Sequence, residues 1–293
     1  MCFRFLSRCA LVLAIAAPWL GCARGAGRAD AVKVATPRAS RRVLHVAADP
    51  NNLPFSNDRL QGFENKIAEV IAKEMDAEVQ YVWRAQRRGF FRHAFKEDGC
   101  ELVLGVPAGF EMAATTAPYY RSTYVFVTRA DGRLNVRSFD DPTLRGMRIG
   151  IQVVGDEGSI TPAGQALARR GLANNLVGYS LYGDYREDSP PARIIDAVAA
   201  GEVDVAVVWG PLAGYFAKRS AVPLEVVPVS PAVEPPGLPF AFDISMGVRK
   251  GEQALRDELN GVIVRRRAEI DRILDEYGVP RLTAAAGEHA SSR

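Results

Sequence analysis

Histidine and cysteine are scarce in this sequence, with three His and four Cys among 293 residues. His45 falls in an expected strand, His93 on an expected helix and His289 near the end of the chain, so the sequence has no group with metal-ligand spacing. We expect these histidines to be structural or solvated. The sequence therefore predicts no metal site and no cofactor.

The motifs of covalent and phosphate chemistry are also missing. There is no Gly-x-Ser-x-Gly elbow and no glycine-rich phosphate loop. Paired carboxylates such as Asp140-Asp141 lie in expected turns, where acidic residues commonly cap helices. We therefore predict that the protein is not an enzyme. With a net charge of +3 and no basic run interleaved with aromatic residues, it is also predicted to have no nucleic-acid partner.

No apolar run reaches the roughly 20 residues that a membrane span needs. The apolar run at residues 10–20 follows Arg4 and Arg8 and precedes small residues, which is the order of an export signal. We predict a signal peptide over residues 1–29, a flexible leader over 30–42 and a periplasmic protein with no membrane span. Cys22 follows Trp19-Leu20-Gly21, so a lipid anchor there is the alternative to simple cleavage.

Few thiols remain once the leader is removed, because Cys2 and Cys9 leave with the signal. Cys100 is then the one certain thiol in an oxidising compartment, so no internal disulfide is expected and the fold rests on its hydrophobic cores. Cys100 precedes an expected strand, and we interpret it as a structural residue that is partly buried.

From residue 43 onward, short β-rich runs alternate with helical patterns, which indicates an α/β fold with parallel strands. The expected strands cover residues 43–47, 78–83, 102–106, 124–128, 147–154, 176–179, 203–208, 224–229 and 242–248. The expected helices cover residues 62–76, 88–96, 161–170, 190–200, 211–218 and 252–277, the last with a break near 265–267.

The same architecture is repeated after residue 130, and two extended segments bracket the repeat. Two such segments are what hinge crossings between two lobes require. We predict lobe 1 over residues 43–129 and 243–282, lobe 2 with the hinge segments over 130–242, and a disordered tail over 283–293.

Several motifs resemble the type II periplasmic binding protein fold of amino-acid receptors. They are Gly62-Phe63-Glu64, Gly99-Cys100-Glu101-Leu102, Ala117-Pro118-Tyr119-Tyr120, the run 201–206 and Val248-Arg249-Lys250-Gly251. Longer runs at 48–57, 86–90, 118–126, 182–186 and 207–215 are similar to one subfamily, the quinoprotein-dehydrogenase-associated proteins that include the J proteins of methanol oxidation. The resemblance covers nearly all of residues 43–281.

The resemblance implies a periplasmic accessory protein that docks on a PQQ-dependent methanol or alcohol dehydrogenase and assists its maturation or activation. A c-type cytochrome is a further implied partner. Relatives often carry Cys at the position of Ala47, as a partner for Cys100, and that bridge cannot form in this chain. The alternative is an ABC-transporter receptor for a small ring-bearing solute that is not an amino acid.

The resemblance also implies where an amino acid would bind. Receptors of this fold hold the ligand carboxylate with an Arg before the Pro-Tyr-Tyr run, and the ammonium with an Asp after a strand of lobe 2. Here residues 108–113 contain no Arg, and Trp209-Gly210-Pro211 contains no Asp. Leaving both ligand charges unpaired in a closed cleft costs several kcal/mol. We therefore expect no free α-amino acid as ligand.

Aromatic and polar residues at the carboxyl ends of the expected strands are the candidates for a ligand or partner cleft. Several of the aromatic residues are equally compatible with the core, the arginines with solvated turns, and the asparagines with backbone capping. The candidates are Asn51, Asn52, Phe55, Arg87, Arg88, Tyr119, Tyr120, Arg121, Tyr124, Tyr182, Asp184, Tyr185 and Trp209.

Overall fold

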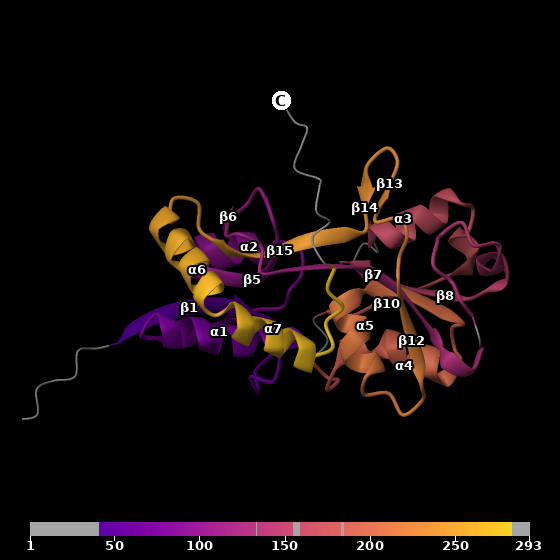
Figure 1. The fold of residues 1–293 in the computed structure, drawn as a ribbon, viewed down its shortest axis with the longest axis horizontal. Helices are drawn as coiled ribbons and strands as arrows, with labels where there is room; N and C mark the ends of the chain where they lie inside the picture. Colours follow the sequence, from indigo (N-terminus) through magenta and orange to yellow (C-terminus); the bar gives the residue numbers. More distant parts are fainter. Residues whose placement is uncertain (1–40, 133, 155–158, 183–184, 283–293) are drawn as a thin grey trace, which may run out of the picture. The chain divides into compact units, whose positions relative to one another are not determined.

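The structure, a computed structural model, describes residues 41–132, 134–154, 159–182 and 185–282. The predicted signal peptide, Cys22, Asp184 and the predicted tail lie outside the described residues. The described residues form one compact unit in which the long strands belong to one sheet, in the order β10-β8-β11-β7-β15-β5-β1-β4 (Figure 1). The predicted α/β class is confirmed.

The first half of the sheet is built from β1 (Arg42–Ala48), β4 (Ala77–Trp83), β5 (Leu102–Pro107) and β15 (Ala241–Val248). Strand β1 lies between β4 and β5 and is parallel to both, whereas β15 runs antiparallel to β5. The burial along β5 is almost continuous, as expected for a central strand covered on both faces.

The second half contains β7 (Tyr120–Arg129), β8 (Ile149–Val154), β10 (Leu176–Ser180), β11 (Val205–Trp209) and β12 (Leu224–Pro228). Strand β8 is parallel to β10 and β11, but β7 is antiparallel to both β11 and β12. The expectation of a parallel sheet is therefore correct only for the strands joined by helices. The strands that link the halves run the other way.

Strand β7 joins the two halves and is longer than its β-rich core of 124–128 suggested. Its first residues, Tyr120 to Thr123, pair with β15, and Tyr124 to Thr128 pair with β11. Shorter strands complete the structure: β2 (Asn51–Asn52), β3 (Ser56–Asn57), β6 (Ala114–Thr115), β9 (Ser159–Ile160), β13 (Val233–Glu234) and β14 (Leu238–Pro239).

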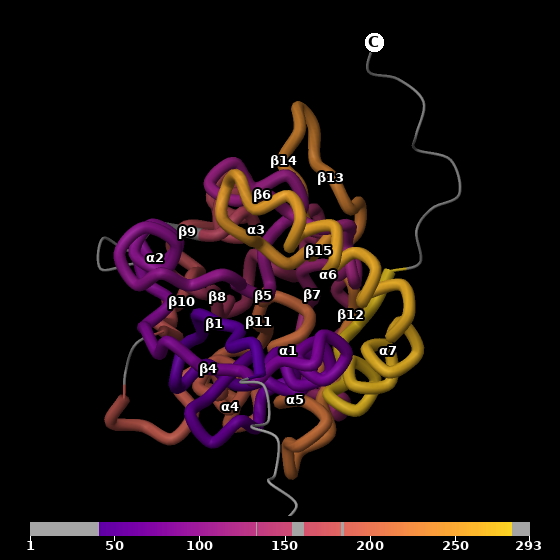
Figure 2. Tube along the Cα trace, turned by 90° about the vertical axis from the view of Figure 1, so that its left-hand side faces the viewer, coloured from indigo at the N-terminus to yellow at the C-terminus, as the bar shows by residue number. Residues whose placement is uncertain are grey.

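The helices divide in the same way between the halves (Figure 1). Figure 2 looks along the molecule from the side of the first half, so that the two halves overlap. Helices α1 (Phe63–Glu74), α2 (Phe90–Arg92), α6 (Gln253–Arg265) and α7 (Arg267–Glu276) belong to the first half. Helices α3 (Pro162–Arg169), α4 (Arg193–Ala200) and α5 (Gly210–Ala217) belong to the second. The predicted break in the last helix is confirmed at Arg266, which ends α6.

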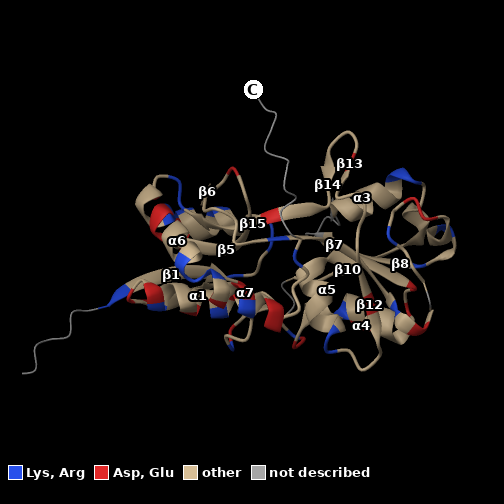
Figure 3. Ribbon diagram, viewed as in Figure 1, with Lys and Arg blue, Asp and Glu red and all other residues tan. Residues whose placement is uncertain are grey.

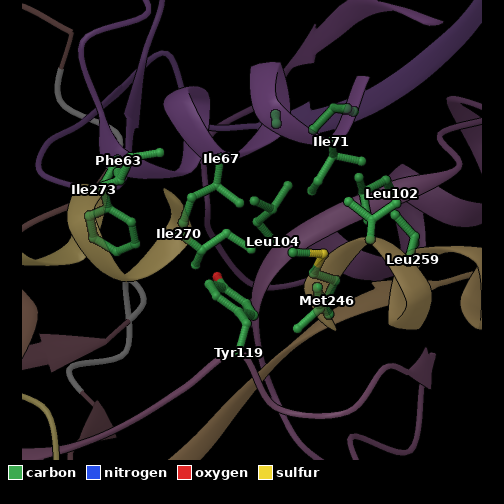
Figure 4. Packing of buried hydrophobic residues seen from close by; sticks show 14 of the residues in the cluster. Phe63, Ile67, Ile71, Leu102, Leu104, Tyr119, Met246, Leu259, Ile270 and Ile273 are labelled. Atoms are coloured by element: carbon green, nitrogen blue, oxygen red, sulfur yellow. The ribbon is translucent and has the colours of Figure 1, made fainter. Parts of the chain in front are cut away.

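The hydrophobic residues form separate clusters in the two halves. In the first, Phe63, Ile67 and Ile71 of α1 pack on Leu102 and Leu104 of β5, with Met246, Leu259, Ile270 and Ile273 closing the cluster (Figure 4). In the second, Phe126 and Ile149 pack with Phe240. Separate cores are compatible with two lobes, but the lobe boundaries and the hinge stay predictions.

The C-terminal segment attaches the first half to α5 of the second. Gly214 and Gly278 approach so closely that a Cβ on Gly214 would lie 1.9 Å from the carbonyl oxygen of Gly278. The rings of Tyr215 and Tyr277 stack at 5.5 Å, and the Ser122 hydroxyl donates to the Pro280 carbonyl at 2.6 Å. Only glycine fits at position 214 without a shift of the backbone.

Basic and acidic residues are interspersed along the surface helices (Figure 3). Most form local pairs, such as Arg84 with Asp98 and Arg281 with Asp271. Among the helices that the structure describes, none is both long and apolar enough to cross a membrane.

Candidate functional site

A tightly bonded turn follows β1. The Asp49 carboxylate is 2% exposed and accepts hydrogen bonds from the backbone N–H groups of Asn51 at 2.8 Å and Gln86 at 2.7 Å. Asn52 is also buried; its amide donates to the Gln86 side chain at 2.8 Å, while its Oδ1 has no hydrogen-bond partner. Burial raises the pKa of Asp49, against the two backbone hydrogen bonds and Arg87, which lower it. The turn is therefore both a structural cap and a source of negative charge.

Aromatic side chains meet at the junction, which is the place where β7 passes from one half of the sheet to the other. Trp209, at the end of β11, packs edge-on against Tyr124 at 5.6 Å and Phe242 at 5.8 Å between ring centroids. Burial raises the pKa of the nearby Tyr120 well above its usual value, and an interaction with Trp209 lowers it. Trp209 and Phe242 are partly buried and contact the cores of both halves. The predicted candidates Tyr120, Tyr124 and Trp209 therefore lie close together.

Two other aromatic candidates belong to the first core. Tyr119 is completely buried, and its hydroxyl accepts the Gly105 N–H at 3.2 Å (Figure 4). Phe55 is partly buried and packs on Phe63 at 5.4 Å. Both lie beside the junction, but Tyr119 presents no surface to solvent.

The arginine candidates lie on two different segments. Arg121 of β7 is half-buried and donates to the Asp243 carboxylate of β15 at 2.8 Å. The consecutive residues Arg87 and Arg88 follow β4 and are exposed, and the charge of Arg87 acts on Asp49 and Tyr185. The charge of Arg121 is therefore already paired within the protein, whereas that of Arg87 acts on two residues near the turn after β1.

Segment 185–188 of the second half faces the turn after β1. A cavity of about 430 Å³ is lined by Pro50, Asn51, Asn57, Asp58, Arg59, Tyr185, Glu187 and Asp188. The Asn51 amide donates to the Glu187 carbonyl at 2.6 Å, and Arg59 lies 4.0 Å from Asp188. Tyr185 is 54% exposed. Asp184, its predicted neighbour in function, lies outside the described residues.

Tyr182 is partly covered and lies within electrostatic reach of two carboxylates. Burial raises its pKa, the charges of Asp49 and Glu64 raise it further, and a hydrogen bond with Gln152 lowers it. A side chain from the second half is thus influenced by acidic groups of the first. The predicted candidates Asn51, Tyr182 and Tyr185 are close together at this junction, although their role in binding stays a prediction.

Glu64 is a functional candidate that sequence reasoning did not select. It is the second residue of α1 and is partly exposed, yet burial raises its pKa to about 8. The sequence marks Glu64 as part of the Gly-Phe-Glu run that opens the helix, which does not by itself indicate a binding role. The run was interpreted as a family motif rather than as a carboxyl facing the junction.

The described residues offer no group of three or more metal-ligating side chains. Cys100 is a completely buried free thiol, and burial raises its pKa to about 11. Cys100 shares a hydrophobic cluster with Ala47. This position confirms a structural thiol, which is more deeply buried than the sequence suggested.

The order of strands, the two antiparallel links and the aromatic junction define a protein of the periplasmic-binding-protein fold. The crystal structure of periplasmic binding protein XoxJ from Methylobacterium extorquens AM1 matches with a TM-score of 0.67 and 37% identity, over 82% of this chain and 99% of that one. MxaJ from Methylophaga aminisulfidivorans MPT matches with a TM-score of 0.69 and 28% identity, over 82% and 100%.

The sequence comparison gives the family. Protein MoxJ of Methylorubrum extorquens AM1 is 32% identical over 260 residues, which cover 86% of this chain and 85% of that protein. The chain belongs to the MoxJ family. No family model matches the sequence.

Proposed function

We propose that the chain is a periplasmic accessory protein of a PQQ-dependent methanol or alcohol dehydrogenase, and that it assists maturation or activation of the enzyme by docking on it. Membership of the MoxJ family supports the link to methanol oxidation. A c-type cytochrome is a further proposed partner. In this role the chain binds and releases a protein and catalyses no reaction of its own.

The observation that carries the proposal is the lack of a zwitterion clamp in a receptor fold. Segment 108–113 contains no Arg, and its Glu111 and Met112 are exposed. The nearest guanidinium along the chain, that of Arg121, is held by Asp243. Trp209 occupies the end of β11, followed by Gly210 at the start of α5. An α-amino acid therefore has no partner for either charge among these residues, which supports a function other than amino-acid uptake.

A co-purification and a deletion test the proposal together. The tagged full chain, expressed in its native host, is recovered from the periplasm, and bound proteins are identified by mass spectrometry. We expect a quinoprotein dehydrogenase, and we expect a deletion strain to make the dehydrogenase polypeptide but to oxidise alcohol more slowly. Recovery of no dehydrogenase, together with unchanged alcohol oxidation, would contradict the proposal.

The transport receptor is the second candidate, and the aromatic junction around Trp209 favours it. A ring-bearing solute would pack against these faces. A screen of non-amino-acid aromatic solutes by thermal shift, with a rise in Tm for one class, would support import. Permease and ATPase genes beside this one would point the same way.

A further inference from the structure

The carboxyl of Glu64 is an ionisable group that has no hydrogen-bond or ion-pair partner among the residues that the structure describes. Its backbone N–H donates to the Phe55 carbonyl at 2.9 Å, which fixes the start of α1 against the preceding turn. Among the described residues, none donates a hydrogen bond to the carboxyl and no Lys or Arg forms an ion pair with it. The residue as a whole is nevertheless partly exposed. The carboxyl is therefore a group near the surface that the described residues do not satisfy.

The chain makes room for this carboxyl on the neighbouring strand. Gly105 of β5 has φ of +73°, and a Cβ placed there would lie 2.3 Å from Oε1 of Glu64. The Gly105 N–H is committed to Tyr119, so it does not serve the carboxyl. A side chain at position 105 would push Glu64 aside. The glycine and the glutamate are matched to each other, which an ordinary surface glutamate would not require.

The groups that face Glu64 are aromatic or acidic. Tyr81 of β4, Tyr119 just before β7, Tyr120 of β7 and Tyr182 of the second half all lie within its electrostatic reach, and all are neutral at pH 7. Asp49 adds a second carboxylate that acts on Tyr182. The described groups that interact with Glu64 are therefore aromatic, and no described cation acts on it, although Arg87 acts on the nearby Asp49 and Tyr185.

We propose that Glu64 is the polar anchor of a ligand site at the junction of the two halves, and that this site takes an ammonium or guanidinium group carried on an apolar or ring-bearing body. Such a cation supplies the charge that Glu64 lacks and packs well against tyrosine and tryptophan faces. An anion would meet two carboxylates. A zwitterionic amino acid would have its ammonium bound and its carboxylate repelled.

Binding of three matched probes to the purified full chain tests the charge preference. Benzylammonium carries the ring and the cation, benzyl alcohol carries the ring alone, and benzoate carries the ring with an anion. We expect benzylammonium to bind with a millimolar Kd and at least about tenfold more tightly than the other two. Glu64→Gln should weaken benzylammonium at least about tenfold, since it keeps the shape and removes the charge. Glu69→Gln, on the solvent side of α1, should leave the Kd unchanged.

The pH dependence gives a second, independent readout. The ¹³C resonance of the Glu64 carboxyl should titrate near pH 8 without ligand and at lower pH with saturating benzylammonium. The affinity should accordingly rise between about pH 6 and pH 9 in the native protein and stay flat in Glu64→Gln. Tighter binding of benzoate, an affinity that falls with pH, an unchanged Kd in Glu64→Gln, or no binding of benzylammonium at about 10 mM would each overturn the proposal.

The cation has two sources, a small amine or a basic side chain of a protein partner. Nα-acetyl-lysine N-methylamide represents the side chain, and phenethylamine represents the free amine. Tighter binding of the capped lysine assigns the site to a partner segment, and tighter binding of phenethylamine assigns it to a small molecule; binding of neither overturns the proposal. All of these measurements use the purified protein. Their outcome is therefore distinguishable from a failure of the dehydrogenase co-purification in cells.

Discussion

The two ends of α1 carry the same residue type in opposite states. Glu74, at the C-terminal end, accepts hydrogen bonds from Arg265 at 2.6 Å and Arg266 at 2.7 Å, and these two arginines lower its pKa. Glu64, at the N-terminal end, has no such partner among the described residues, and burial raises its pKa to about 8. One helix of 12 residues thus holds one neutralised carboxylate and one that is left without a counter-charge.

The difference is not what the helix dipole alone would give. The N-terminus of a helix favours a negative charge and the C-terminus disfavours it, each by about 0.3–1 kcal/mol. Desolvation disfavours the negative charge of Glu64 at the N-terminal end, and the two arginines favour that of Glu74 at the C-terminal end. Both tendencies are therefore reversed. At its C-terminal end, α1 is tied to the point where α6 meets α7, which is a structural contact. At its N-terminal end, α1 faces the junction, where the proposed ligand would supply the counter-charge.

The largest effect is expected from Gly105→Ala, which disturbs the N-terminal end of α1, where Glu64 lies. The new Cβ would clash with the Glu64 carboxyl and would also be held at φ of +73°. We expect loss of benzylammonium binding and a fall of about 1–3 kcal/mol in the free energy of unfolding, measured by urea denaturation. Gly109→Ala is the matched control, because Gly109 has φ of +75° with no atom within 4 Å of an added Cβ. Equal losses in both variants would mean that the clash with Glu64 contributes nothing.

The second prediction uses pH to separate the two ends. The folded-state pKa of Glu64 lies above its usual value of 4.5, so its contribution to stability is complete below about pH 4.5 and is lost as pH rises to about 8. Relative to Glu64→Gln, the native protein should therefore lose on the order of 3 kcal/mol across that window, measured by denaturation at several pH values. A constant difference between the two proteins from pH 5 to pH 8 would show that Glu64 is solvated like any surface carboxylate.

Much of the fold could be predicted from the sequence because the helical and β patterns are local. The apolar spacing in α1 and the slip near residue 266 located those elements to within a few residues. The antiparallel course of β7 and β15 could not be predicted, because strand direction depends on which distant strand each one pairs with. The start of β7 at Tyr120 was also missed, since its first residues are ordered by β15 rather than by their own β-rich pattern.

The candidate site was predictable in part. Asn51, Tyr182 and Trp209 follow strands, and the strand order brings them to the junction. Glu64 could not be recognised from its position in the sequence, because its significance depends on the space left by Gly105 and on the lack of a cation beside it among the described residues. Arg121 was selected for its charge, but Asp243, more than a hundred residues away, already uses that charge.

The third prediction concerns Glu74, at the C-terminal end of α1, and has a smaller expected effect. Glu74→Gln removes the charge that Arg265 and Arg266 share, so we expect a small fall in Tm, greatest at low ionic strength. The folded-state pKa of Glu74 is lowered, so its contribution is present above about pH 4.5 and is lost as pH falls. The pH trend is thus opposite to that of Glu64. If thermal denaturation showed the same pH dependence of stability in Glu74→Gln and Glu64→Gln, the two ends of α1 would not differ in the way described.

The smallest effect is expected in the middle of the same helix, where Glu69 is exposed and lies 3.8 Å from Lys66. Pairs of this kind are screened by water and salt, so Glu69→Gln should change the free energy of unfolding by about 0.5 kcal/mol or less. It should not alter the pH dependence between pH 5 and pH 8. If the Glu69 variant matched Glu64→Gln in the denaturation series, loss of any negative charge on α1 would be enough to change the pH dependence of stability. The raised pKa of Glu64 would then have to be explained by the net charge of the helix rather than by burial of the carboxyl beside Gly105.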